Sequence, residues 1–125
     1  MIAIETSSMI AFFAGASGQD VDATKSAIIF RQAVFPPAVV TELLSDPNLS
    51  SEAASYLQHI AQLEVHPGYW DRAGELRAQI LRRGLKAHLA DTLIAQSCID
   101  HDVALVTRDQ DFRHFARYAG LRLSK

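Results

Sequence analysis

Residues 1–13 read MIAIETSSMIAFF, and this stretch predicts how the fold begins. The apolar run 2–4 is expected to form a short buried strand. The hydroxyls of residues 6–8 suit the start of a helix, which we expect over residues 9–13. Glu5 lies between the two elements, and a carboxylate near a core costs free energy unless a cation or a hydrogen-bond donor compensates it. The sequence therefore predicts a polar site at the carboxyl end of the first strand.

Short apolar runs and helical stretches continue to alternate along the chain. Further strands are expected at residues 34–35, 63–65, 104–106 and 121–123. Helices are expected near residues 20–32, 38–44, 50–62, 69–83, 88–102 and 109–118. Strands separated by helices are typical of a parallel sheet covered on both faces and joined by right-handed crossovers. We expect an α/β fold, a three-layer α/β/α sandwich with a short, mainly parallel sheet.

Composition describes an ordinary globular protein. The 125 residues are 49% apolar and 21% charged and contain no linker or repeat, so a single domain over residues 1–125 is expected. The single Cys98 excludes an internal disulfide and indicates a buried thiol in a reducing, cytoplasmic compartment. No basic leader precedes an apolar stretch, and no apolar run reaches membrane-spanning length. We expect no signal peptide, no membrane anchor and no membrane partner.

Five acids follow or lie within segments expected to be regular. They are Glu5, Glu42, Asp91, Asp109 and Asp111. In parallel sheets the ligand site lies outside the carboxyl ends of the strands, where the first strand and the strand at 104–106 would bring three of these acids. On its predicted helix, Asp91 projects onto an apolar stripe rather than a charged face.

Each acid taken alone also has an ordinary structural explanation. Asp91 suits the positive end of a helix dipole, Glu42 suits an exposed helix face, and Asp109 and Asp111 suit a turn or a helix cap. Taken together, four separate segments would have to place an acid near one sheet edge by chance. Carboxylate oxygens match Mg²⁺ or Mn²⁺, and no Cys/His cluster favours zinc. Such a site suits phosphodiester hydrolysis.

Basic residues are concentrated in the second half of the chain. Residues 1–65 hold two basic residues against seven acids, whereas residues 66–125 hold ten against seven. A polyanion is therefore expected to contact the second half, although a solvated helix face explains the same pattern. Arg108 and Arg113 are the candidate phosphate contacts, with surface salt bridges as the alternative. The pair at 69–70, Tyr-Trp, is either a packing staple or a partner surface.

Four segments of this chain resemble the motif blocks of PIN-domain ribonucleases, in order and over nearly the whole chain. They are residues 4–10, IETSSMI; residues 41–44, TELL; residues 89–95, LADTLIA; and residues 105–112, LVTRDQDF. The similarity is greatest to the VapC toxins of toxin–antitoxin pairs. The resemblance implies a PIN-like fold, Mg²⁺- or Mn²⁺-dependent endoribonuclease activity on tRNA, rRNA or mRNA, a cognate VapB-like antitoxin and a homodimer.

The resemblance also assigns roles to residues of this chain. Glu5, Glu42, Asp91 and Asp109 are implied as the catalytic and metal-binding acids, with Asp111 as a further metal ligand. Ser7 or Thr6 is implied to assist these acids. The expected substrate-side residues are Ser7, Thr107, Arg108 and Arg113, and the hydroxyls of Ser7 and Thr107 would orient water or a carboxylate unless they only cap a helix.

Glu5 departs from the family pattern, which has aspartate at this place. The longer side chain keeps the charge but moves the carboxylate, and a shift of about 1 Å in a catalytic group can cost on the order of 100-fold in rate. A catalytically silent PIN-like module that binds antitoxin or RNA is therefore the main alternative. A receiver-like signalling domain is disfavoured, because residues 65–67, Val-His-Pro, lack a phospho-acceptor aspartate.

Overall fold

The computed structural model describes residues 1–124 and contains a four-stranded sheet with the order β3-β2-β1-β4. Its strands are β1 (Ile2–Ile4), β2 (Ala33–Phe35), β3 (Ala61–Gln62) and β4 (Ala104–Val106). All three strand pairs are parallel, and β1 lies between β2 and β4. The carboxyl ends of the two central strands therefore meet at one edge of the sheet.

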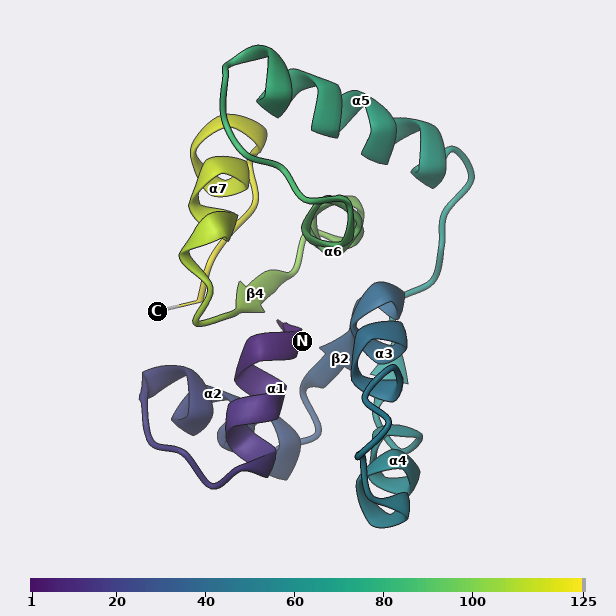
Figure 1. Cartoon of the computed structure of the whole chain (residues 1–125), viewed down its shortest axis with the longest axis vertical. Helices are drawn as coiled ribbons and strands as arrows, with labels where there is room; N and C mark the ends of the chain where they lie inside the picture. The colour runs from purple at the N-terminus through teal and green to yellow at the C-terminus, as the bar shows by residue number, and fades with distance from the viewer. Residues whose placement is uncertain (125) are drawn as a thin grey trace.

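Seven α-helices and one 3₁₀ helix are formed by the described residues (Figure 1). They are α1 (Thr6–Phe13), α2 (Gln19–Ile29), α3 (Pro37–Leu44), α4 (Ser51–Leu57), α5 (Tyr69–Arg82), α6 (Leu89–His101), η1 (Gln110–Phe112) and α7 (Arg113–Ala119). The helix α1 packs on α2 on one side of the sheet, whereas α3 and α6 pack together and α5 covers α6. The predicted three-layer α/β/α sandwich is confirmed.

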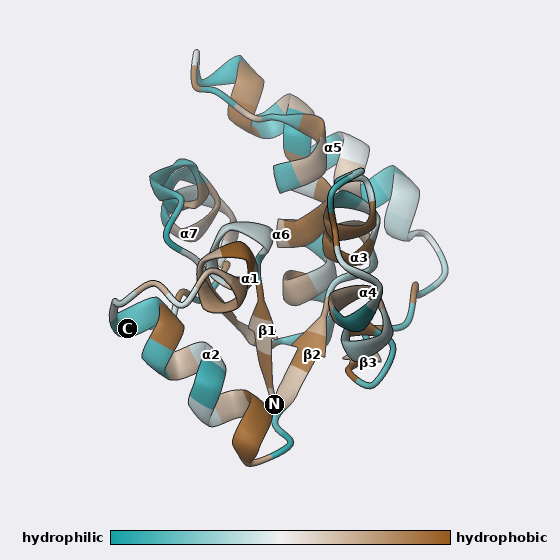
Figure 2. Cartoon of the chain, turned by 60° about the horizontal axis from the view of Figure 1, so that its bottom comes forward, coloured by the Kyte–Doolittle hydropathy of each residue, from teal (hydrophilic) through white to brown (hydrophobic). Residues whose placement is uncertain are grey.

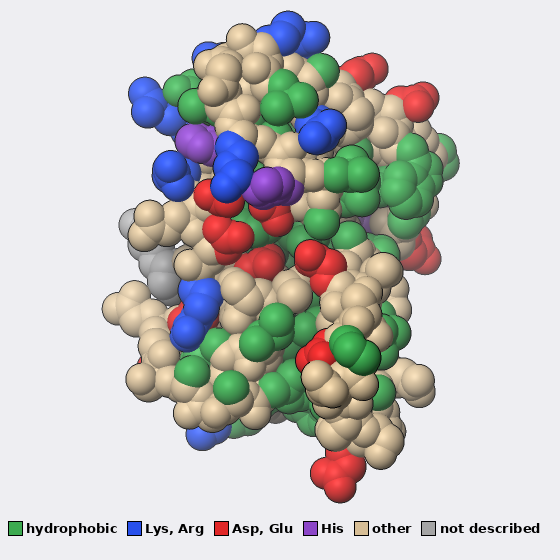
Figure 3. Space-filling model, viewed as in Figure 1, with side chains coloured by type: hydrophobic (Ala, Val, Ile, Leu, Met, Phe, Trp, Pro, Cys, Tyr) green, Lys and Arg blue, Asp and Glu red, His purple; other side chains and the backbone are tan. Residues whose placement is uncertain are grey.

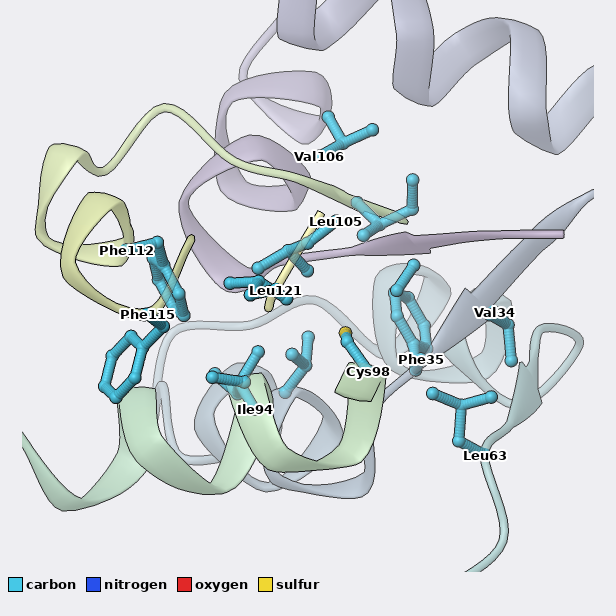
Figure 4. Packing of buried hydrophobic residues seen from close by; sticks show 14 of the residues in the cluster. Val34, Phe35, Leu63, Ile94, Cys98, Leu105, Val106, Phe112, Phe115 and Leu121 are labelled. Carbon is cyan, nitrogen blue, oxygen red and sulfur yellow. The ribbon is translucent and has the colours of Figure 1, made fainter. Parts of the chain in front are cut away.

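The core lies between the sheet and its helices. In Figure 4, Ile94 and Cys98 of α6 face Phe35 and Leu105 of the sheet, and all four are buried. Each large apolar side chain removed from water contributes about 1.5–3 kcal/mol. Figure 2 shows β1 and β2 hydrophobic along their length, as strands buried on both faces should be, whereas α2 and α5 alternate in hydropathy.

Cys98 is a structural thiol. Burial raises its pKa to about 12, so it stays protonated and unreactive at neutral pH. Its place in the core agrees with the expected buried thiol. No helix within residues 1–124 is long and apolar enough to span a membrane.

Two predicted strands were wrong in detail. The third strand pairs at residues 61–62 rather than 63–65, and the preceding helix α4 ends at Leu57. The short β2 explains this, because its register ends at Phe35 and only one further bond, from Leu63 N to Phe35 O at 2.8 Å, extends the pairing. The expected strand at 121–123 is a single parallel bridge between Leu123 and Leu105, flanked by two hydrogen bonds.

The first helix begins at Thr6, three residues earlier than predicted. Glu5, rather than a hydroxyl of residues 6–8, is its N-cap, and the Glu5 carboxylate accepts the Ser7 amide hydrogen. The hydroxyls of Thr6 and Ser7 are therefore free to bond other side chains. Both contact acids of the site described next.

Candidate metal centre

The predicted acids lie at the carboxyl edge of the sheet, on four different segments. Glu5 directly follows β1, and its amide donates to Val106 O at 2.9 Å. Asp109 and Asp111 follow β4, Asp91 lies in the first turn of α6, and Glu42 lies in α3. Figure 3 shows a group of acidic side chains in the middle of one face, with basic and histidine side chains beside it.

Three of the acids form a compact triad. One carboxylate oxygen from each of Asp91, Asp109 and Asp111 lies within 4.8 Å of the other two. The loop after β4 sets this geometry, because Asp109 caps η1 by accepting the Asp111 amide hydrogen at 2.9 Å. The turn-and-cap explanation for these two acids is therefore correct, yet it also orients them towards a third acid.

Thr107 connects the triad to Glu5. The Thr107 hydroxyl donates to Glu5 Oε1 at 2.5 Å and accepts the Asp109 amide hydrogen at 3.0 Å. Glu5 is only 4% exposed, and it also accepts bonds from the amide and the hydroxyl of Ser7. Both Glu5 oxygens are thus occupied by donors of the chain. Among the described residues, Glu5 supports the triad rather than joining its close oxygen group.

Glu42 is held from the same turn of α1. The Thr6 hydroxyl donates to Glu42 Oε1 at 2.6 Å. Neighbouring hydroxyls of α1 therefore orient the two glutamates, Thr6 for Glu42 and Ser7 for Glu5. Glu42 lies outside the triad but contributes its negative charge to the site, where it helps to raise the pKa of Asp91.

The site carries more negative charge than its surroundings compensate. Burial, together with the negative charges of Asp109, Glu5 and Glu42, raises the pKa of Asp91 to about 6, although His88 opposes the shift. A carboxylate with this environment favours either a proton or a cation. An all-carboxylate oxygen set suits a hard divalent cation such as Mg²⁺ or Mn²⁺, so the residues present fit the expected cofactor.

The basic residues near the site differ in how they are held. Lys86 Nζ lies 3.6 Å from Asp111 Oδ2 and is largely exposed. Arg113 donates to the nearby Gln110 carbonyl at 2.8 Å and is exposed. Arg108 is paired with Asp20, with its Nε 2.8 Å from Asp20 Oδ2. Of the two arginines predicted to contact phosphate, only Arg113 has no acidic partner among the described residues.

Sequence reasoning missed two residues of this neighbourhood. Asp20 looked like a helix-start residue, and Lys86 looked like part of a solvated helix face. Thr6 was expected to assist the acids as an alternative to Ser7, whereas in the structure each of the two hydroxyls bonds a different glutamate. The contacts of Asp20 and Lys86 join segments far apart in the chain, 88 residues apart for Asp20 and Arg108, and no local pattern indicates them.

A separate groove lies between α1 and α4. It has a volume of about 580 Å³ and is lined by Phe12, Phe13, Leu49 and Tyr56, among others. None of the five acids borders it. It is larger than the hollow beside Arg108, but its acids, Asp46 and Glu52, are not part of the group of close carboxylate oxygens, which lies at the sheet edge.

The PIN domain model matches residues 2–118, and the chain belongs to this family. Its fold is similar to three solved complexes. VapBC2 from Rickettsia felis, bound to a promoter DNA fragment, is 21% identical with a TM-score of 0.69, covering 99% of this chain and 98% of that one. FitAcB from Neisseria gonorrhoeae is 17% identical with a TM-score of 0.71, covering 100% and 97%. VapBC-5 from Mycobacterium tuberculosis, a toxin–antitoxin family member, is 16% identical with a TM-score of 0.72, covering 99% and 97%.

No curated protein matches the chain. The predicted resemblance to PIN domains is confirmed, and the likeness to VapC-type proteins holds at the level of the fold.

Proposed function

We propose that this PIN domain is a metal-dependent endoribonuclease and the toxin of a toxin–antitoxin pair. The observation that carries the proposal is the convergence of Asp91, Asp109 and Asp111 within 4.8 Å, in surroundings that raise the pKa of Asp91 to about 6. A site with this excess of negative charge, at the carboxyl edge of the sheet in a PIN domain, favours a divalent cation.

Mg²⁺ or Mn²⁺ would be held by the triad. When bound, such an ion activates water and stabilises the charge that develops on a phosphodiester. The chain itself supplies orientation: Ser7 and Thr107 fix the Glu5 carboxylate, and Thr6 fixes Glu42. In this proposal Glu5 and Glu42 keep the site acidic, although only the triad oxygens lie close together.

RNA is the proposed substrate, as tRNA, rRNA or mRNA. Arg113 and Lys86 are exposed basic residues at the edge of the acidic site and would contact backbone phosphates. The excess of basic residues in the second half of the chain supports approach of a polyanion from that side.

A VapB-like antitoxin and a second copy of the chain are the proposed protein partners, in the cytoplasm. Support comes from the similar structures, several of which are complexes named VapBC or FitAB. The Tyr-Trp pair at the start of α5 has two different roles. Tyr69 is a packing staple, buried with its hydroxyl 2.6 Å from Leu93 O, whereas Trp70 is 65% exposed and available to a partner.

The deciding experiment incubates the purified chain with total RNA. Cleavage is expected with Mg²⁺ or Mn²⁺, and EDTA is expected to stop it because the triad needs a cation to compensate its charge. Fragment ends would be mapped by sequencing. Asp91→Asn, prepared in parallel, is the control for contaminating nuclease and should not cleave RNA. Cleavage by the wild type that persists in EDTA, while Asp91→Asn is inactive, would contradict the proposal.

One observation favours the alternative of a silent module that binds antitoxin or RNA. Both oxygens of Glu5 are already bonded, to Ser7 and Thr107, and its carboxylate is turned back to cap α1. If the usual aspartate reaches the cation directly, then this glutamate has withdrawn one ligand.

Exchanging Glu5 for aspartate separates the two functions. Glu5→Asp keeps an N-cap side chain, so stability should change little. Because Glu5 supports the triad without joining its close group, we expect wild type and variant to cleave RNA at rates within about tenfold, a difference near 1.4 kcal/mol. Cleavage by the variant alone would establish that the natural glutamate silences the site.

A further inference from the structure

Asp20 is an acid whose side chain is only 13% exposed. It lies outside the metal centre, yet its contacts join three segments of the chain. Its two oxygens accept Arg108 Nε at 2.8 Å and Arg108 Nη2 at 3.0 Å, a bidentate pair. Asp20 Oδ2 also accepts the hydroxyl of the fully buried Ser8 at 2.8 Å. The pair therefore links α2, α1 and the loop after β4. The Arg108 guanidinium, through its hydrogen bonds, holds the pKa of Asp20 at about 2, so the acid is ionised at every working pH.

The backbone is adapted to this pair. Gly18 precedes α2 with φ of 144°, a conformation that favours glycine. A Cβ atom there would lie 2.7 Å from Asp20 Oδ1 and 3.1 Å from Arg108 Nη2. The Arg108 Nη2 also donates to the Ser17 carbonyl at 3.2 Å. Glycine at position 18 thus leaves the room that the two side chains need.

Arg108 stands in the middle of the loop that carries the acids. Its neighbours are Thr107, which bonds Glu5, and Asp109, a member of the triad. The Arg108 amide donates to the Ser7 hydroxyl at 3.3 Å. Fixing the Arg108 side chain to α2 therefore limits the movement of Thr107 and Asp109 relative to Glu5 and Asp91.

We propose that Asp20 is a positioning residue of the metal centre, which acts through Arg108 to hold the loop of Thr107 and Asp109 in the geometry that binds the cation. The inference rests on the proposed function and assigns to Arg108 a different role from the phosphate contact expected from the sequence. The bidentate geometry supports this role, because both guanidinium nitrogens facing Asp20 are already bonded.

The test measures Mn²⁺ binding in the absence of RNA, by calorimetry or by the electron paramagnetic resonance of free Mn²⁺. Asp20→Asn and Arg108→Ala are each expected to weaken binding about 10- to 100-fold, as loss of an outer support of a metal site does. Because both act through one contact, the double variant should bind as weakly as either single variant. Arg108→Ala removes a side chain that is 39% exposed, and it carries the test if Asp20→Asn folds poorly.

Asp22→Asn is the matched control. Asp22 lies in the same first turn of α2, is exposed, and has no ion-pair partner among residues 1–124. The control removes the same charge from the helix N-terminus and should bind Mn²⁺ like the wild type.

RNA cleavage at saturating Mn²⁺ distinguishes the two roles of Arg108. If Arg108 contacts phosphate instead, Arg108→Ala should raise KM for RNA, and Asp20→Asn should bind Mn²⁺ like the wild type. That pair of results would overturn the inference. Mn²⁺ binding by the wild type that Asp20→Asn does not alter would overturn the inference alone. Failure of the wild type to bind Mn²⁺ would overturn the proposed function and the inference with it.

Discussion

The Asp91→Asn variant is expected to lose RNA cleavage and yet to melt at a higher temperature than the wild type in metal-free buffer. Loss of a triad carboxylate should lower the cleavage rate at least about 100-fold, the cost of displacing a catalytic group by about 1 Å. The gain in stability follows from electrostatics. Burial and the charges of Asp109, Glu5 and Glu42 all disfavour ionised Asp91, and asparagine removes that charge at similar volume.

The sign and size of the stability effect follow from the pKa. An acid whose pKa rises from 3.8 to about 6 on folding is less stable in its charged form in the folded chain, so at pH 7 it destabilises the fold. Two pKa units correspond to about 3 kcal/mol, and because Asp91 is only partly buried, solvent screening reduces this to about 1 kcal/mol. A rise of a few degrees in melting temperature is expected.

Asp100→Asn on the same helix is the control for this variant. Asp100 accepts Arg72 Nε at 3.0 Å and Arg72 Nη2 at 2.5 Å, and Arg72 keeps the pKa of Asp100 below its usual value. The same substitution should therefore destabilise the fold there and leave cleavage in place. Both properties would be measured by thermal melting and by the RNA assay. Lower stability of Asp91→Asn than of the wild type would contradict the uncompensated charge at this site.

The alternation of apolar runs and helices was enough to predict the architecture. The central strands β1 and β4 came out at the predicted residues because both are buried runs with acids or turns directly behind them. The edge of the sheet was less predictable. Pairing at β3 depends on how far β2 extends, and pairing at Leu123 depends on Leu105, so these contacts are properties of the partner strand rather than of the local sequence.

The acids of the site were predictable because an acid beside a buried segment stands out in the sequence. Their division into triad and supports was not. Glu5 lies outside the close oxygen group of the triad, and the donors that hold it come from Ser7, two residues along the chain, and from Thr107, about a hundred residues away. Arg108 illustrates the same limit. Its neighbours in sequence indicate a phosphate contact, whereas its partner in space is Asp20.

The charge of Asp91 should be visible, without metal, as a pH-dependent difference in stability between the wild type and Asp91→Asn. In EDTA, the stabilising contribution of protonated Asp91 is fully present below pH 3.8 and is lost as the pH rises to about 6. Other acids also change the stability over this pH range, but the wild type and Asp91→Asn both contain them. The difference in melting temperature between variant and wild type should therefore widen between about pH 4 and pH 6 and stay constant above, which isolates Asp91.

Above pH 6, adding Mn²⁺ should make the wild type melt at a higher temperature than Asp91→Asn, the reverse of their order in EDTA. A cation at a hundred times its dissociation constant stabilises the folded chain by about 2.7 kcal/mol, more than the charge repulsion it relieves. The wild type should then melt above its own EDTA value at pH 7.5, with a much smaller shift at pH 5, where protons compete for Asp91. Asp91→Asn should lose most of the shift at both pH values. An equal Mn²⁺ shift at pH 5 and pH 7.5, or a full shift in the variant, would place the bound cation away from the triad.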